Sequence, residues 1–125
     1  MDILEIEKII IKEGFLTGSR AWCVNNSASD YDYVLYGTSF YGIKGILDES
    51  GFVFANCYNN SIKLVIHDKE YNLFTGIRGK VDNIKTTTEI LRAYPKSILN
   101  NKKQRVYIFE NTMSLLKNFN CTPYL

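Results

Sequence analysis

The sequence predicts one α+β domain over residues 1–125, an α/β sandwich in which a short, twisted, mixed sheet of about five strands packs against helices. The length of 125 residues suits a single domain. Hydrophobic residues make up 46% of the chain and charged residues 22%, as in ordinary globular proteins. Segments with helical periodicity alternate with short aromatic and β-branched runs, and this order places helices against a sheet.

The first third of the chain predicts two helices and two strands. Asp2 is expected to cap the first helix and Gly14 to end it, because isoleucines recur on one face between them. The later elements have the composition of short strands around a glycine turn. The expected ranges are a helix at 2–13, a strand at 15–17, a short helix at 19–24 and a strand at 30–36.

The middle and the end of the chain predict three more strands and three more helices. Ser39 is expected to cap a helix that Gly51 stops, and Asp82 to cap a helix that ends before Pro95. The last helix has an apolar stripe at helical spacing, formed by Val106, Phe109, Met113 and Leu116. The expected ranges are helices at 40–49, 82–93 and 101–119, and strands at 52–55, 62–67 and 71–75.

A glycine-serine turn and a pair of acids form the most informative segment of the sequence. Gly18 and Ser19 open the predicted short helix, where free backbone N–H groups favour a phosphate. Asp30 and Asp32 are two apart in a predicted strand, so their side chains share a face. Two adjacent carboxylates repel each other unless a cation lies between them or one is protonated. Because Mg²⁺ and Mn²⁺ prefer oxygen ligands, the segment predicts a phosphate site beside a site for one of these ions.

This segment resembles the signature of the DNA polymerase β-type nucleotidyltransferase superfamily. The signature is a hydrophobic residue, Gly-Ser, a spacer of about a dozen residues and Asp-x-Asp on a strand, here Gly18, Ser19, Asp30 and Asp32. The string looks most like the small single-domain members, which include minimal nucleotidyltransferases of toxin–antitoxin pairs and phage proteins. The resemblance implies that Asp30 and Asp32 bind metal and that Gly18 and Ser19 hold the triphosphate of an NTP. Arg20 is expected to add a charged contact to the nucleotide if it points inward.

The third carboxylate of the family is the point at which the sequence departs from the resemblance. Family members carry an aspartate on a later strand, where this chain has Asn72. An asparagine can ligate a metal through its carbonyl oxygen, but it cannot act as a general base. Glu70 lies two residues away on the same face and could substitute from a longer side chain. The candidate catalytic residues are therefore Asp30, Asp32, Glu70 and Asn72.

The charge of the chain is divided unevenly between its two halves. Residues 1–75 carry six basic and ten acidic residues, whereas residues 76–125 carry nine basic and three acidic residues. A basic half indicates a polyanionic partner, although Lys102, Lys103 and Arg105 can equally be solvated residues of a helix face. The chain has no apolar run of membrane-span length, no signal peptide and no Cys-x-x-Cys among its three cysteines. We therefore expect a cytoplasmic protein without a membrane partner.

Two functions follow as expectations. The first is a nucleotidyltransferase that moves a nucleoside monophosphate from an NTP to a protein or RNA hydroxyl, with a divalent metal. The second is a catalytically inactive protein of the same fold that binds protein or RNA, for example as a phage-encoded inhibitor or an antitoxin-like subunit. Asn72 motivates the second expectation, because it removes a charge that the reaction uses.

Overall fold

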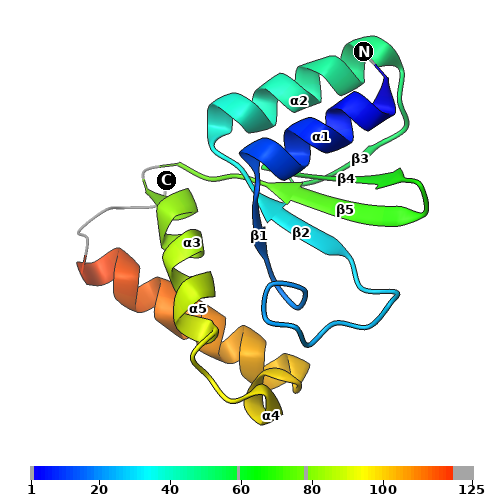
Figure 1. Cartoon of the computed structure of the whole chain (residues 1–125). Coiled ribbons are helices and arrows are strands. Elements are labelled where there is room, and N and C mark those ends of the chain that lie inside the picture. The colour runs from blue at the N-terminus through cyan, green and yellow to red at the C-terminus, as the bar shows by residue number, and fades with distance from the viewer. Residues whose placement is uncertain (1, 59, 78, 120–125) are drawn as a thin grey trace.

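The computed structural model describes residues 2–58, 60–77 and 79–119, and it shows an α+β fold built on a mixed sheet (Figure 1). The order of strands in the sheet is β1-β2-β5-β4-β3. β2 and β5 are parallel, and the other neighbouring pairs are antiparallel. The predicted α+β class is confirmed. The strands are β1 (Phe15–Thr17), β2 (Tyr31–Val34), β3 (Ala55–Tyr58), β4 (Ser61–Ile66) and β5 (Lys69–Phe74).

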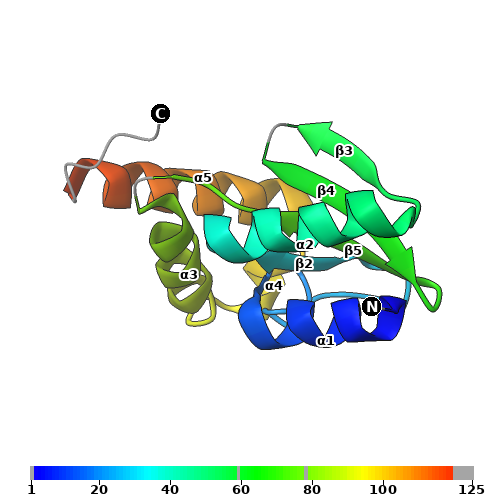
Figure 2. The same cartoon turned by 90° about the horizontal axis from the view of Figure 1, so that it is seen from above.

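One face of the sheet is covered by α1 (Ile3–Glu13) and α2 (Gly37–Ser50) (Figures 1 and 2). The main hydrophobic core lies between these helices and the sheet. The Asp2 side chain accepts a hydrogen bond from the Glu5 backbone N–H at 2.9 Å, so the predicted cap of the first helix is confirmed. The fully buried residues of this core include Ile6, Ile10, Phe40, Leu47, Tyr71 and Leu73.

The opposite face of the sheet is covered only in part. α3 (Lys80–Leu91) packs Val81 and Ile84 against Val34 of β2. No helix of the described residues covers the part of this face that lies over β4. The exposure of its alternate residues Lys63 and Val65 shows this. The site described below lies on this uncovered part of the sheet, beside the C-terminal helices. Those helices are α4 (Lys96–Leu99), which the sequence analysis did not predict, and α5 (Lys102–Phe119).

The predicted helix at 19–24 is wrong. The segment forms hydrogen-bonded turns, in which the Gly18 carbonyl accepts from the N–H groups of Ala21 at 3.0 Å and Trp22 at 3.3 Å. Cys23 has a φ of 58°, in the left-handed region, and this conformation ends the right-handed turn. A turn of this length has no helix dipole of the kind that the phosphate prediction assumed.

Three other boundaries differ from the expectations for reasons of pairing and capping. The strand predicted at 52–55 lies at Ala55–Tyr58, where it pairs with β4. α2 begins at Gly37 with Tyr36 at its N-cap, so Ser39 lies inside the first turn. α3 begins after Gly79, whose φ of 83° sets the entry to the helix, and Asp82 lies in its first turn.

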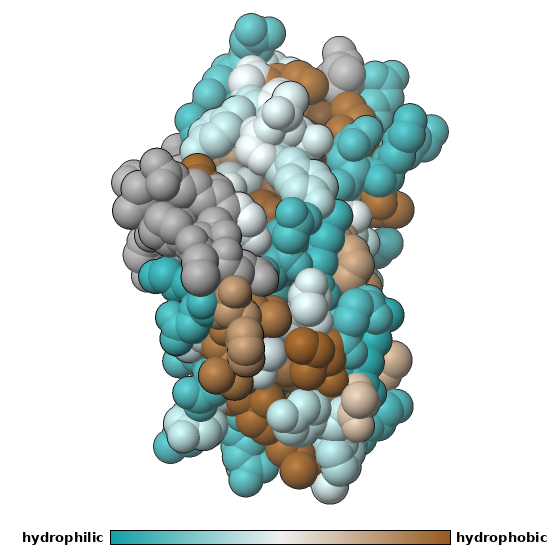
Figure 3. All heavy atoms as spheres, turned by 90° about the vertical axis from the view of Figure 1, so that its left-hand side faces the viewer, coloured by the Kyte–Doolittle hydropathy of each residue, from teal (hydrophilic) through white to brown (hydrophobic). Residues whose placement is uncertain are grey.

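α5 is only partly packed against the rest of the molecule. None of its residues is fully buried, although Phe109 and Met113 of the predicted stripe contact the cluster under α3. Tyr107 and Phe119 are 70% and 81% exposed. In the view of Figure 3, hydrophobic atoms gather in the lower half of the molecule, where α3 to α5 lie. Across the described ranges, no helix has the length and hydropathy needed to cross a membrane.

Candidate functional site

The pairing of β2 with β5 brings the two aspartates and the asparagine of the motif together. The parallel register places Asp32 next to Asn72. The Asn72 Nδ2 donates one hydrogen bond to Asp30 Oδ2 and one to Asp32 Oδ1, each at 2.9 Å. The Oδ1 atom of Asn72 is buried and has no hydrogen-bond partner. The two carboxylates therefore share one donor group, the carboxamide of Asn72.

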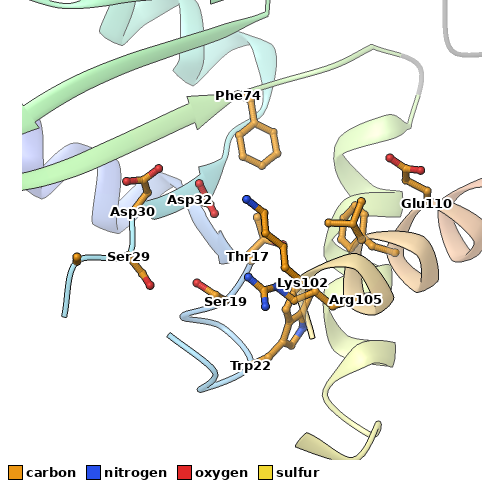
Figure 4. Close-up of a pocket in the computed structure, with 14 residues that line it drawn as sticks. Thr17, Ser19, Trp22, Ser29, Asp30, Asp32, Phe74, Lys102, Arg105 and Glu110 are labelled. Atoms are coloured by element: carbon orange, nitrogen blue, oxygen red, sulfur yellow. The ribbon is translucent and has the colours of Figure 1, made fainter. Parts of the chain in front are cut away.

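A pocket of about 590 Å³ lies in front of the two aspartates. Ser19, Ser29, Asp30 and Asp32 line one side, and Lys102 and Arg105 extend into the pocket from α5 on the other side (Figure 4). Trp22, Phe74 and Phe109 supply aromatic lining. Neither Lys102 nor Arg105 was predicted individually as a site residue. The basic excess of the C-terminal half was the one signal that pointed to them.

Gly18 permits the close contact between the turn and β2. Its φ is 76°, and a Cβ atom added to it would lie 2.4 Å from Asp32 Oδ2. No real Cβ atom comes this close to an oxygen without displacement. The glycine of the motif is thus required by the position of Asp32, in addition to its backbone conformation.

Arg20 holds the loop before Asp30 and does not line the pocket. Its guanidinium lies 3.8 Å from the centre of the Tyr31 ring, which is a stacking distance. Its Nε and one terminal nitrogen donate to the Ser29 carbonyl at 3.1 and 2.8 Å. The expectation of a nucleotide contact required an inward side chain, and the structure shows it turned to the loop instead.

The first prediction concerns this loop. Arg20→Lys keeps the charge but loses the planar fork, so it cannot donate two hydrogen bonds to Ser29 and stack on Tyr31 together. We expect hydrogen exchange at residues 25–29 to become about tenfold faster, because the local opening loses about 1.4 kcal/mol of protection. Arg92→Lys, at an exposed arginine paired with Glu89, is the control. Unchanged exchange in the loop would show that Arg20 does not hold it.

Burial raises the pKa of Asp32 above its usual value of 3.8. The Asn72 hydrogen bond opposes this effect, and the neighbouring Asp30 carboxylate adds to the rise. Lys63 and Arg105 lower the pKa by their positive charge, but burial outweighs them. The net direction shows that the positive charges around Asp32 do not fully compensate for its burial.

The second prediction is the pH dependence that this shift causes. The folded protein keeps the Asp32 proton to a higher pH than the unfolded chain, so this group makes the free energy of unfolding fall as pH rises from about 3.8 to the raised pKa. Asp32→Asn removes the titration and should flatten this part of the profile. Urea denaturation in small pH steps measures it, with Asp48→Asn, an exposed carboxylate on α2, as control. A wild-type profile in Asp32→Asn would contradict the assigned shift.

Glu70 does not complete the site. It lies on β5 two residues from Asn72, but it is exposed and does not line the pocket. Within the described ranges, no group of three or more histidine, cysteine or acidic side chains could hold a metal ion. The space between Asp30 and Asp32 faces the Asn72 N–H groups, which repel a cation. With the Asn72 N–H groups directed at both carboxylates, the site does not fit a divalent ion between Asp30 and Asp32.

Comparisons of the chain with protein-family models, with curated proteins and with solved structures find no match. A function for this chain therefore has to be inferred from the residues that line the pocket. They combine hydroxyl groups, two cationic side chains and aromatic rings on one side of a pair of carboxylates that an amide already bridges.

Proposed function

We propose that this chain is a catalytically silent nucleotidyltransferase-like protein that binds a nucleotide in the pocket without transferring it. One observation carries the proposal: Asn72 donates to both Asp30 and Asp32 from the position at which the family has its third acid. A carboxamide cannot accept the proton of an attacking hydroxyl, and its N–H groups oppose a bridging ion. Both features that make the family catalytic are thus weakened by the same residue.

The composition of the pocket supports a nucleotide as the ligand. Lys102 and Arg105 can neutralise phosphate oxygens, and Ser19 can donate a hydroxyl hydrogen bond to them. Phe74 and Phe109 offer aromatic surface for a planar base. The volume of about 590 Å³ lies within the range of small-molecule sites.

A second candidate is an active transferase that moves a nucleoside monophosphate to a protein or RNA hydroxyl. It is favoured by one observation, namely that Asp30 and Asp32 line the same pocket as Lys102 and Arg105. It requires the Asn72 amide to leave the carboxylates when the substrate binds. Glu70, the nearest acid on β5, is exposed and does not line the pocket, so it does not replace the amide in this arrangement.

Calorimetry with ATP tests the binding part of the proposal. We expect wild-type protein to bind ATP in EDTA, and the double variant Lys102→Gln/Arg105→Gln to bind it at least about tenfold more weakly, because each charged hydrogen bond contributes about 1.5–3 kcal/mol. The matched control is Lys8→Gln/Lys12→Gln, which removes the same charge from exposed positions of α1 on the covered side of the sheet. Equal affinity in the two double variants would place the nucleotide elsewhere or exclude it.

Labelled NTPs test the silent part. Incubation with Mg²⁺ or Mn²⁺, RNA and lysate protein should give no transfer above the level of Asp30→Ala/Asp32→Ala. Transfer by the wild-type protein that is lost in this double variant would contradict the proposal of a catalytically silent protein and support the active transferase. The two experiments fail independently, since a protein can bind ATP without transferring any part of it.

A further inference from the structure

We propose that the Asn72 carboxamide is a built-in substitute for a cation between Asp30 and Asp32, and that it makes this carboxylate pair independent of divalent ions. Its Nδ2 lies 2.9 Å from one oxygen of each carboxylate. Two acids at this separation need a positive partner, and the two amide hydrogens supply partial positive charge to both. The inference concerns the pair itself and does not depend on whether a nucleotide binds.

The orientation of the amide is fixed by electrostatics. With the opposite orientation, the Asn72 Oδ1 would face two carboxylate oxygens, and like partial charges would repel. In the observed orientation Oδ1 is buried without a hydrogen-bond partner. An unpaired buried acceptor is unfavourable, so the two bonds to Asp30 and Asp32 must outweigh this loss. The amide group is thus oriented by its two hydrogen bonds to the acids.

The backbone keeps the amide in this position. Asn72 lies in the middle of β5, where its residue partners are Asp32 of β2 on one side and Lys63 of β4 on the other. Strand pairing on both sides prevents the residue from withdrawing. Lys63 adds a full positive charge on the same face of the sheet, and this charge lowers the pKa of Asp32 against the effect of burial. Within the sheet, the Asn72 amide and the Lys63 charge thus both favour the charged form of Asp32.

This arrangement opposes a divalent ion directly. Mg²⁺ requires oxygen ligands at about 2.0–2.1 Å in an octahedral arrangement. The Asn72 N–H groups point at the oxygens that such an ion would use, and they repel it. An ion can enter only if the amide turns over or leaves. We therefore infer that the wild-type pair stays as it is in millimolar Mg²⁺ or Mn²⁺.

Thermal unfolding of purified full-length protein tests the inference without any activity measurement. Wild type, Asn72→Asp, Asn72→Leu and Asn111→Asp are compared in EDTA, in Mg²⁺ and in Mn²⁺ at matched ionic strength. Asn72→Asp adds a third carboxylate, and Asn72→Leu removes the donors at similar volume without adding charge. Asn111→Asp makes the same charge change at an exposed position of α5 and is the control.

The wild-type midpoint should shift by less than about 2 °C on addition of either ion. Asn72→Asp in EDTA at neutral pH should unfold about 10 °C lower or more, because a third, partly buried carboxylate would lie beside Asp30 and Asp32 without a positive partner. Millimolar Mn²⁺ should restore at least half of that loss. Asn72→Leu should also be less stable than wild type in EDTA, and Asn111→Asp should behave as wild type in all three buffers.

Two results would overturn the inference. The first is a wild-type midpoint that rises with Mn²⁺ as much as that of Asn72→Asp, since the amide would then not exclude the ion. The second is an Asn72→Leu variant as stable as wild type in EDTA, since the carboxylates would then not need the donors. Asn72→Leu adds no charge, so it keeps the test decisive if Asn72→Asp fails to fold.

Discussion

Gly18→Ala is expected to destabilise the protein by about 2–4 kcal/mol, whereas Gly51→Ala should cost about 1 kcal/mol. The two glycines have nearly the same left-handed backbone, with φ values of 76° and 70°. A Cβ atom at Gly51 would meet nothing within 4 Å, but at Gly18 it would lie 2.4 Å from Asp32 Oδ2. Backbone strain is therefore common to both substitutions, and the difference between them measures the contact with Asp32.

Urea denaturation of the two alanine variants measures this difference. A double-mutant cycle with Asp32→Ala identifies its cause, because Gly18→Ala should cost about 1–3 kcal/mol less once the carboxylate is absent. Equal losses in Gly18→Ala and Gly51→Ala would mean that the turn moves away from β2 without penalty. In that case Gly18 would be needed for its backbone conformation alone.

The same contact has a consequence for the site. A displaced Asp32 carboxylate cannot keep its hydrogen bond to Asn72, which lies at 2.9 Å in the native geometry. The Gly-Ser turn thus packs directly against the Asp-x-Asp strand. The absence of a side chain at Gly18 allows Asp32 to lie against the turn. In this chain, Gly18 and Asp32 are therefore coupled although they lie fourteen positions apart in the sequence.

Much of the fold could be predicted because it depends on local patterns. The Asp2 cap, the amphipathic first helix and the short strands follow from residue spacing over a few positions. The segment at 19–24 was misread for the same reason. Its composition allows a helix, but the left-handed backbone of Cys23 ends it, and cysteine gives no sequence signal for that conformation.

The chemistry of the site could not be predicted to the same depth, because it depends on pairing over long distances. Asn72 meets Asp32 only because β5 lies parallel to β2, and the sequence did not show which strands would be neighbours. Lys102 and Arg105 reach the pocket from a helix that follows α3 and α4. The direction of an asparagine amide, with its nitrogen toward two acids, is a property of the assembled site.

Trp22→Ala is expected to cause the largest loss of stability near the pocket, about 3–5 kcal/mol. The indole is 7% exposed and packs with Leu91 and Leu99. Its Nε1 donates to the Thr88 carbonyl at 3.0 Å. This side chain therefore ties the turn after Gly18 to α3, and its removal leaves a cavity that the surrounding helices cannot easily fill.

Trp22→Phe separates a core role from a ligand role. Phenylalanine keeps most of the apolar area and loses one hydrogen bond, so the loss should be about 1 kcal/mol, because Thr88 still accepts from the Arg92 N–H at 3.3 Å. If the indole acts through packing, ATP affinity in Trp22→Phe should match wild type within about threefold, since a 1 kcal/mol stability loss leaves almost all of the protein folded. An affinity loss of tenfold or more with only this small change in stability would mean instead that the ring contacts the base.

Trp22 is the single tryptophan and lines the pocket, so its fluorescence in wild-type protein reports both unfolding and ligand binding. Agreement between the fluorescence and calorimetric ATP titrations would show that the binding event measured by calorimetry also changes the environment of this ring.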